Sequence, residues 1–198
     1  MPQTEVDTTV FGNTNILTDG LGKTTGGGKN TISMLVGAMA LSGTVLPQIS
    51  AGGSLSGTFH IVTTDGAGPI QAVLDPTATG KFSTGIPLTV VEQIPGTNGN
   101  FVAAKKKQQR RWVWERALDA AGLTKRASNV NQAFAFKFSV PAGTTCNGTV
   151  AGMTGVCLVK IANPSKAGPF GGVVPVQLAV AGAATANGAT KCGRAFQA

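Results

Sequence analysis

The sequence predicts a mainly β protein: a single antiparallel β-sandwich domain with one or two short helices. Its 198 residues include 28 Gly and 10 Pro but only 12% charged residues, a composition typical of many short elements joined by turns. Short segments rich in β-branched and aromatic residues follow one another, each bounded by Gly, Pro or Asp. Neither an internal repeat nor a second composition class divides the chain, so we expect one domain over residues 1–198.

The elements are expected in the following order. Residues 1–30 are polar and turn-rich, which predicts an irregular lead-in ending in a flexible Gly-rich loop. The apolar segment 31–41 fits a short helix or a buried strand, and its periodicity does not separate the two. Strand signals then recur over residues 57–64, 70–74, 88–94, 134–140, 155–161 and 173–180.

One of these strands has a particularly regular pattern. Phe134, Phe136, Phe138 and Val140 alternate with small or polar residues, as in a strand with one buried face. The chain ends in an Ala/Gly-rich tail over residues 181–198.

The cysteines indicate the compartment. Cys146 and Cys157 bracket a Gly-rich stretch that fits two short strands around a turn, so a disulfide across this hairpin is expected. Such bridges belong to oxidising compartments, which predicts a secreted protein whose leader is absent from this sequence. Cys192 is left free or pairs between chains.

Asn147 opens an Asn-Gly-Thr glycosylation sequon. No stretch is long and apolar enough to predict a transmembrane segment.

Most of the formal net charge of +8 lies in one segment. The segment from Lys105 to Arg126 contains eight basic residues and two acidic residues, Glu115 and Asp119, so its net charge is +6. The rest of the chain carries +2. Good helix formers here predict a basic helical insert over residues 103–128.

Three interpretations of the insert stay open. It is a solvated surface helix, a processing segment cut after the dibasic pairs that end at Arg111 and Arg126, or a surface that attaches to an anionic partner. We expect no nucleic-acid partner, because the chain offers no second basic face. The candidate surface-binding residues are Lys105, Lys106, Lys107, Arg110, Trp112 and Trp114.

The sequence offers little for catalysis. Asp65 and Asp75 are conceivable paired carboxylates, but each precedes turn chemistry, where an Asp bonds its own backbone. His60 is the single histidine, and nothing around it forms a catalytic triad. We therefore expect no catalytic residue, no cofactor and no metal site, with His60 as the one weak candidate ligand.

Three blocks resemble the Egh-type virulence-factor family of filamentous fungi, which includes appressorium-specific proteins of plant pathogens. They are SLSGTFHIVTTDGAGPIQAVLD (54–75), VPAGTTCNGTVAGMTGVCLVKI (140–161) and NPSKAGPFGGVVPVQ (163–177). The resemblance implies secretion from a fungus and a role in surface penetration or host colonisation, with no established biochemical activity. The chain lacks the cysteines that many members carry where Ile161 and Val173 stand here, and it lacks their N-terminal His-Gly.

Two functions are carried forward. The first is a secreted fungal virulence-associated factor that binds cell-wall polysaccharide or a host surface component through loops, without catalysis. The second is a copper-dependent polysaccharide monooxygenase-like protein in truncated or degenerate form, in which His60 matches only the second histidine of a copper brace.

Overall fold

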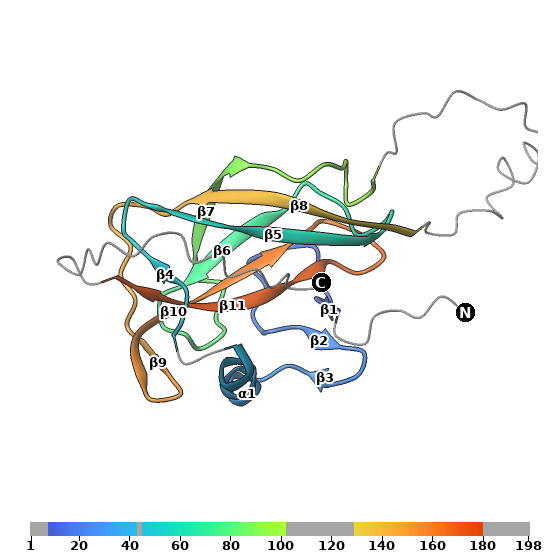
Figure 1. Cartoon of the computed structure of the whole chain (residues 1–198). Coiled ribbons are helices and arrows are strands. Elements are labelled where there is room, and N and C mark those ends of the chain that lie inside the picture. The colour runs from blue at the N-terminus through green and yellow to red at the C-terminus, as the bar shows by residue number, and fades with distance from the viewer. Residues whose placement is uncertain (1–7, 43–44, 102–128, 180–198) are drawn as a thin grey trace, which may run out of the picture.

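The computed structural model of the chain describes residues 8–42, 45–101 and 129–179, which are mostly antiparallel β structure with one short helix, as predicted (Figure 1). The helix is α1 (Ile32–Ser42). The strands are β1 (Thr9–Val10), β2 (Lys23–Thr24), β3 (Gly28–Lys29), β4 (Gln48–Ile49), β5 (Ser54–Thr63), β6 (Gln71–Asp75), β7 (Ile86–Glu92), β8 (Asn129–Ser139), β9 (Gly148–Val150), β10 (Met153–Ala162) and β11 (Phe170–Leu178).

The strands form one continuous hydrogen-bonded path that folds over itself into two layers. Its order is β3-β2-β1-β11-β10-β6-β7-β8-β5, with β4 added to β11 and β9 added to β10. Strands β5, β8 and β7 form the upper layer in Figure 1, and β6, β10 and β11 lie below them. Strand β7 belongs to both layers because it pairs with β6 and with β8. All pairings are antiparallel except that of β4 with β11.

The main hydrophobic core fills the space between the two layers. Phe136 and Phe138 of β8 reach into it from above, and Cys157, Val159 and Ile161 of β10 from below. From Phe134 to Phe138, every second residue of β8 is thus directed into the core, as the period-two pattern predicts.

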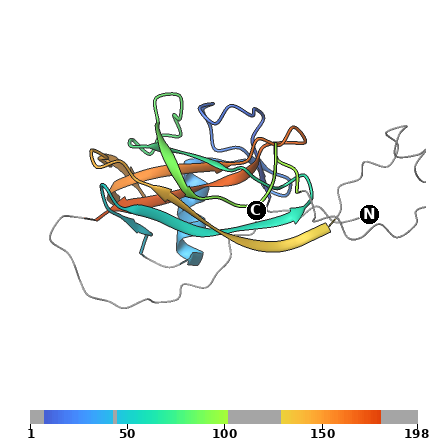
Figure 2. The ribbon, with the colours of Figure 1, turned by 90° about the horizontal axis from the view of Figure 1, so that it is seen from above.

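A second core lies on the outer face of the lower layer. Val156 and Leu158 of β10 pack there against Leu21 of the lead-in, Met39 of α1 and Phe82. The apolar segment 31–41 therefore forms a helix, which runs across the strands rather than along them (Figures 1 and 2). Because β10 is covered on both faces, its sequence is apolar almost throughout instead of alternating.

One local prediction was wrong. The Gly-rich end of the lead-in, expected as a flexible loop, is the hairpin of β2 and β3, with β2 paired to β1. The backbone N–H of Gly27 donates to Thr24 Oγ1 inside the turn. Because β1 in turn pairs with β11, this hairpin forms one edge of the sheet.

The predicted disulfide is confirmed. Cys146 and Cys157 are bonded, with their Cα atoms 5.0 Å apart, and they join the start of β9 to the middle of β10. The hairpin between them pairs Met153 with Val150 and Thr154 with Thr149.

The turn role predicted for Asp75 is also confirmed. Its carboxylate accepts hydrogen bonds from the backbone N–H groups of Thr77, Thr79 and Gly80, each at 2.8 Å, and from the Thr77 hydroxyl at 2.6 Å. Asp75 is 1% exposed, so this network fixes the turn that follows β6 from inside the protein.

Candidate functional site

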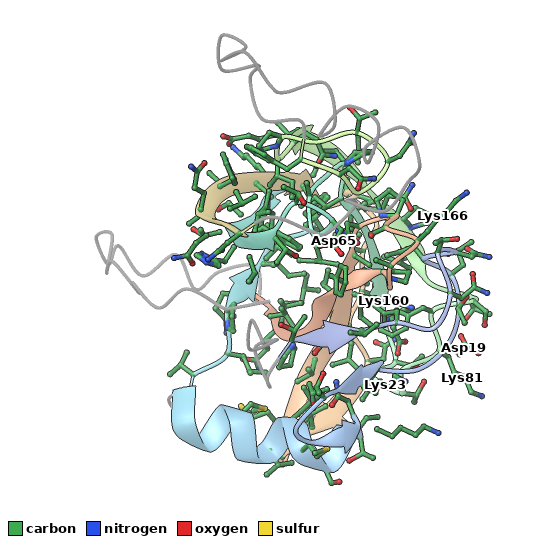
Figure 3. The ribbon with its side chains drawn as sticks, turned by 90° about the vertical axis from the view of Figure 1, so that its right-hand side faces the viewer. Asp19, Lys23, Asp65, Lys81, Lys160 and Lys166 are labelled. Carbon is green, nitrogen blue, oxygen red and sulfur yellow. A yellow bond between two sulfur atoms is a disulfide. The ribbon has the colours of Figure 1, made fainter. Side chains whose placement is uncertain are left out.

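Three loops meet at one end of the sandwich. They follow β5 (residues 64–70), follow β7 (residues 93–101) and join β10 to β11 (residues 163–169). This is the right-hand end in Figure 1, and Figure 3 looks onto it. Two of the three loops come from the sequence blocks that carry the family resemblance.

Backbone hydrogen bonds hold the first two loops together. Ala67 N donates to Gly99 O at 3.0 Å, and Gly99 N donates to Gly68 O at 2.9 Å. Gly68 N donates to Pro95 O at 3.0 Å, which adds a third tie. The first two loops therefore form one hydrogen-bonded unit.

The third loop docks through a buried side chain. Asn163 is 2% exposed, and its Nδ2 donates to Ala67 O at 2.9 Å. Its Oδ1 accepts from Phe170 N at 2.8 Å and from Ser165 N at 3.3 Å. One asparagine thus shapes its own loop and ties it to the first one.

The second and third loops are also in close contact. A Cβ placed on Gly99 would lie 2.5 Å from Ser165 Cα, and Gly99 has φ +79°. Only glycine accommodates both this backbone conformation and this approach. The arrangement of the three loops is therefore fixed by packing as well as by hydrogen bonds.

The loops line an open pocket of about 540 Å³. Asp65 lies on its wall and accepts a hydrogen bond from the Thr63 hydroxyl. Asp65 and Lys166 both lie in the upper half of the molecule in Figure 3. The complete lining is Asp65, Asn98, Asn100, Pro164, Ser165, Lys166 and Ala167.

His60 of β5 is not among the residues that line this pocket. Its Nε2 is 2.8 Å from Asn131 Oδ1 on the neighbouring strand β8. Within residues 8–42, 45–101 and 129–179, no group of three or more His, Cys, Asp and Glu side chains is arranged to hold a metal ion. Asp65 and Asp75 are used at different turns.

Several predicted residues lie outside the described part of the chain. The basic insert 103–128 and the tail 181–198 fall there. The same holds for Lys105, Lys106, Lys107, Arg110, Arg111, Trp112, Trp114, Arg126 and Cys192.

The described segments on either side of the insert end beside each other near the pocket. Phe101 N donates to Thr64 O, and Asn129 pairs with Thr63.

Sequence reasoning missed a buried lysine beneath the lead-in. Lys160 of β10 is 2% exposed, and its Nζ donates to Thr18 O at 2.7 Å. The ammonium lies 4.5 Å from the ring centroid of Phe11 and 5.2 Å from that of Phe82. These are cation–π distances. The available signal was a lysine in a strand that is otherwise apolar on both faces.

Burial lowers the pKa of Lys160 below its ordinary 10.5, and the charge of Asp19 acts in the opposite direction. Between the lowered pKa and 10.5, the unfolded chain binds more protons at this site than the folded protein. The free energy of unfolding is therefore expected to rise with pH over this alkaline window. In Lys160→Met this pH-dependent contribution should disappear. The free energy of unfolding at neutral pH should change by no more than about 1 kcal/mol.

Urea unfolding of both proteins from neutral pH to about 10.5 measures this difference. Lys29→Met serves as the control, because Lys29 is exposed on β3. If wild type and Lys160→Met gain stability equally over this alkaline pH range, the lowered pKa of Lys160 is contradicted.

The described residues include no helix with the length and apolar character needed to cross a membrane.

Comparison with known proteins gives one family match and several curated relatives. The family model described as "Egh16-like virulence factor" matches residues 1–171. The chain is 40% identical over 162 residues to the appressoria-specific virulence factor GAS1 of Pyricularia oryzae, covering 81% of this chain and 54% of that protein. It is 32% identical over 130 residues to GAS2 of the same organism, covering 65% of this chain and 37% of that protein. The chain thus spans about half the length of these relatives, or less. No solved structure matches it.

Proposed function

Because the chain belongs to the Egh16-like virulence factor family, we propose that it is a secreted fungal virulence-associated factor that acts at the host surface or cell wall during penetration, by binding without catalysis. The observation that carries this proposal is the pocket at the end of the sandwich. Its walls come from three loops, of which the first two are joined by backbone hydrogen bonds and the third is tied to the first by the Asn163 side chain. Loops on a rigid scaffold are the usual place for recognition.

The chemistry of the pocket supports binding over hydrolysis. Among the residues that line it, Asp65 is the one carboxylate, whereas glycoside hydrolysis ordinarily uses two facing carboxyl groups. Secretion is supported by the disulfide between Cys146 and Cys157, since such bridges persist in oxidising compartments. The relatives named for the appressorium support a role in penetration.

A depletion experiment tests this function. The purified chain is mixed with insoluble plant cell wall, and separately with fungal cell wall, and the protein left in solution is measured. The supernatant is analysed for released sugars by mass spectrometry, with and without added copper and a reductant. We expect protein to be removed by at least one wall material with no sugar released. Released or oxidised sugars would replace binding by an enzymatic function, and the copper arm would identify the monooxygenase alternative.

Proteolytic processing at Arg111 or Arg126 remains a proposal, and the sheet predicts its consequence. Strand β8 pairs with β5 and β7, and β10 pairs with β6, so strands on both sides of the cut are interleaved. A chain cut there should migrate as two fragments on a denaturing gel but elute as one species under native conditions. Intact mass of protein secreted by a fungal host measures whether the cut is made, and a single uncut mass contradicts processing.

Glycosylation at Asn147 also remains a proposal. Asn147 and Thr149 are exposed, while Cys146 and Gly148 between and beside them are buried. The sequon is therefore accessible at the surface although its hairpin is anchored by the disulfide. Protein from a fungal host should carry a glycan mass that Thr149→Ala removes. Equal masses for wild type and variant would show that the site is not used.

A further inference from the structure

We infer that the pocket formed by residues 65, 98, 100 and 164–167 binds a neutral, hydroxyl-rich glycan. This inference rests on the proposed function, which it makes specific by assigning both the site and the class of ligand. The charge, the hydrogen-bonding groups and the rigidity of the pocket all favour such a ligand.

The charge of the pocket wall is balanced. Asp65 contributes one carboxylate and Lys166 one ammonium group, and the other lining residues are uncharged. Among the described residues of the lining, a strongly anionic ligand would meet Asp65 with Lys166 as the single basic group to offset it. A cationic ligand would meet Lys166 in the same way. The wall therefore favours a ligand without net charge.

The uncharged polar groups both donate and accept hydrogen bonds. Asn100 Nδ2 donates to Asn98 O at 3.1 Å, which leaves the Asn100 side-chain oxygen as an acceptor. Ser165 Oγ accepts from Ala167 N at 3.3 Å, so its hydroxyl proton is available for donation. A sugar hydroxyl is itself both donor and acceptor, and a ring that bears several of them matches such a mixed wall.

Ser165 makes this a built site rather than a surface depression. Its side chain is 2% exposed, yet it contributes to the lining. Its Oγ is held in place by Ala167 N and keeps one proton to donate, so a ligand hydroxyl can pair with it. Pro164 and Ala167 add apolar surface beside these polar groups, against which the C–H face of a sugar ring can pack.

The pocket is also fixed before the ligand arrives. Asn163, Gly99 and Ala67 tie the three loops through the hydrogen bonds and the close approach described above. Binding therefore costs little ordering of the protein, which matters for a ligand held mainly by hydrogen bonds. The volume of about 540 Å³ is in the range of small-ligand sites, so a short oligosaccharide is the appropriate probe.

Isothermal titration with soluble hexasaccharides tests the inference. The neutral probes are cellohexaose, chitohexaose, laminarihexaose and mannohexaose, and the anionic probe is hexagalacturonate. We expect at least one neutral probe to bind, with hexagalacturonate bound more weakly. Asp65→Asn removes the charged acceptor and should raise the Kd by about tenfold or more. Glu92→Gln makes the same chemical change at an exposed position on β7 and should leave the Kd unchanged.

A second pair of variants separates binding from folding. Lys166→Met removes the ammonium group from the pocket, and Lys81→Met makes the same change at an exposed lysine outside it. We expect only Lys166→Met to weaken binding, with matching thermal unfolding curves for both variants.

The outcomes distinguish this inference from the proposed function. If the wild type binds a neutral probe and both pocket variants bind it equally well, the site assignment is overturned while the binding function stands. If the wild type adheres to wall material but binds no neutral probe, or binds hexagalacturonate most tightly, the ligand class is overturned. If it neither adheres to walls nor binds a probe, both proposals fail.

Discussion

Replacing Asp75 by alanine is expected to lower the free energy of unfolding by about 3–5 kcal/mol. The carboxylate accepts four hydrogen bonds from the turn after β6, and the side chain is buried. Alanine would leave backbone N–H groups of Thr77, Thr79 and Gly80 without their acceptor in a place that water reaches poorly. The effect should spread to the lead-in, because Gly20 N donates to Gly80 O at 2.9 Å.

Urea unfolding measures this loss directly. Asp75→Asn should fall between wild type and Asp75→Ala, because an amide retains one acceptor oxygen. Glu92→Ala, which removes an exposed carboxylate, should change the free energy of unfolding by less than about 0.5 kcal/mol. A loss below about 1 kcal/mol in Asp75→Ala would contradict the role given to this turn.

Removing the disulfide by the double change Cys146→Ala and Cys157→Ala is expected to destabilise the protein by about 3 kcal/mol. The bridge closes a loop with a sequence separation of 11, and its loss restores conformational freedom to that segment in the unfolded chain. Cys157 also lies fully buried in the main core, opposite Val176 of β11, so the loss weakens the centre of the lower layer.

The matched measurement compares the double variant with wild type under oxidising and reducing conditions, both with Cys192→Ser to prevent exchange. The reductant should lower the stability of wild type toward that of the double variant, which also lacks the two buried sulfur atoms, and leave the variant unchanged. Equal stability of the two oxidised proteins would remove the bridge as a source of stability.

The larger strands could be predicted because their side chains report burial locally. The alternation from Phe134 to Val140 places one face of β8 against the core, and the apolar run of β10 fits a strand covered on both sides. The turn role of Asp75 was likewise readable from the Pro that follows it.

The short strands and the second core could not be predicted. Strands β1 to β4 have two residues each, too few to show a period, and they exist because the sheet edge pairs with them. Lys160 was missed because what makes a lysine tolerable there, the Thr18 carbonyl and two phenyl rings, comes from distant parts of the chain.

The pocket could not be predicted from the sequence either. Asp65, Asn100 and Ser165 are far apart in sequence, and each resembles an ordinary loop residue by itself. Only the contacts made by Gly99 and Asn163 bring the three loops together. The sequence blocks that resemble the family could be recognised, and two of them contribute the loops after β5 and β10.

We propose that the protein binds its ligand at this loop end of the sandwich. Amide chemical-shift mapping of the labelled protein during titration with the neutral hexasaccharides tests it most directly. We expect the largest shifts to fall within residues 65–69, 96–101 and 163–170. Shifts confined to the basic segment 105–126 or to α1, with the three loops unchanged, would contradict it.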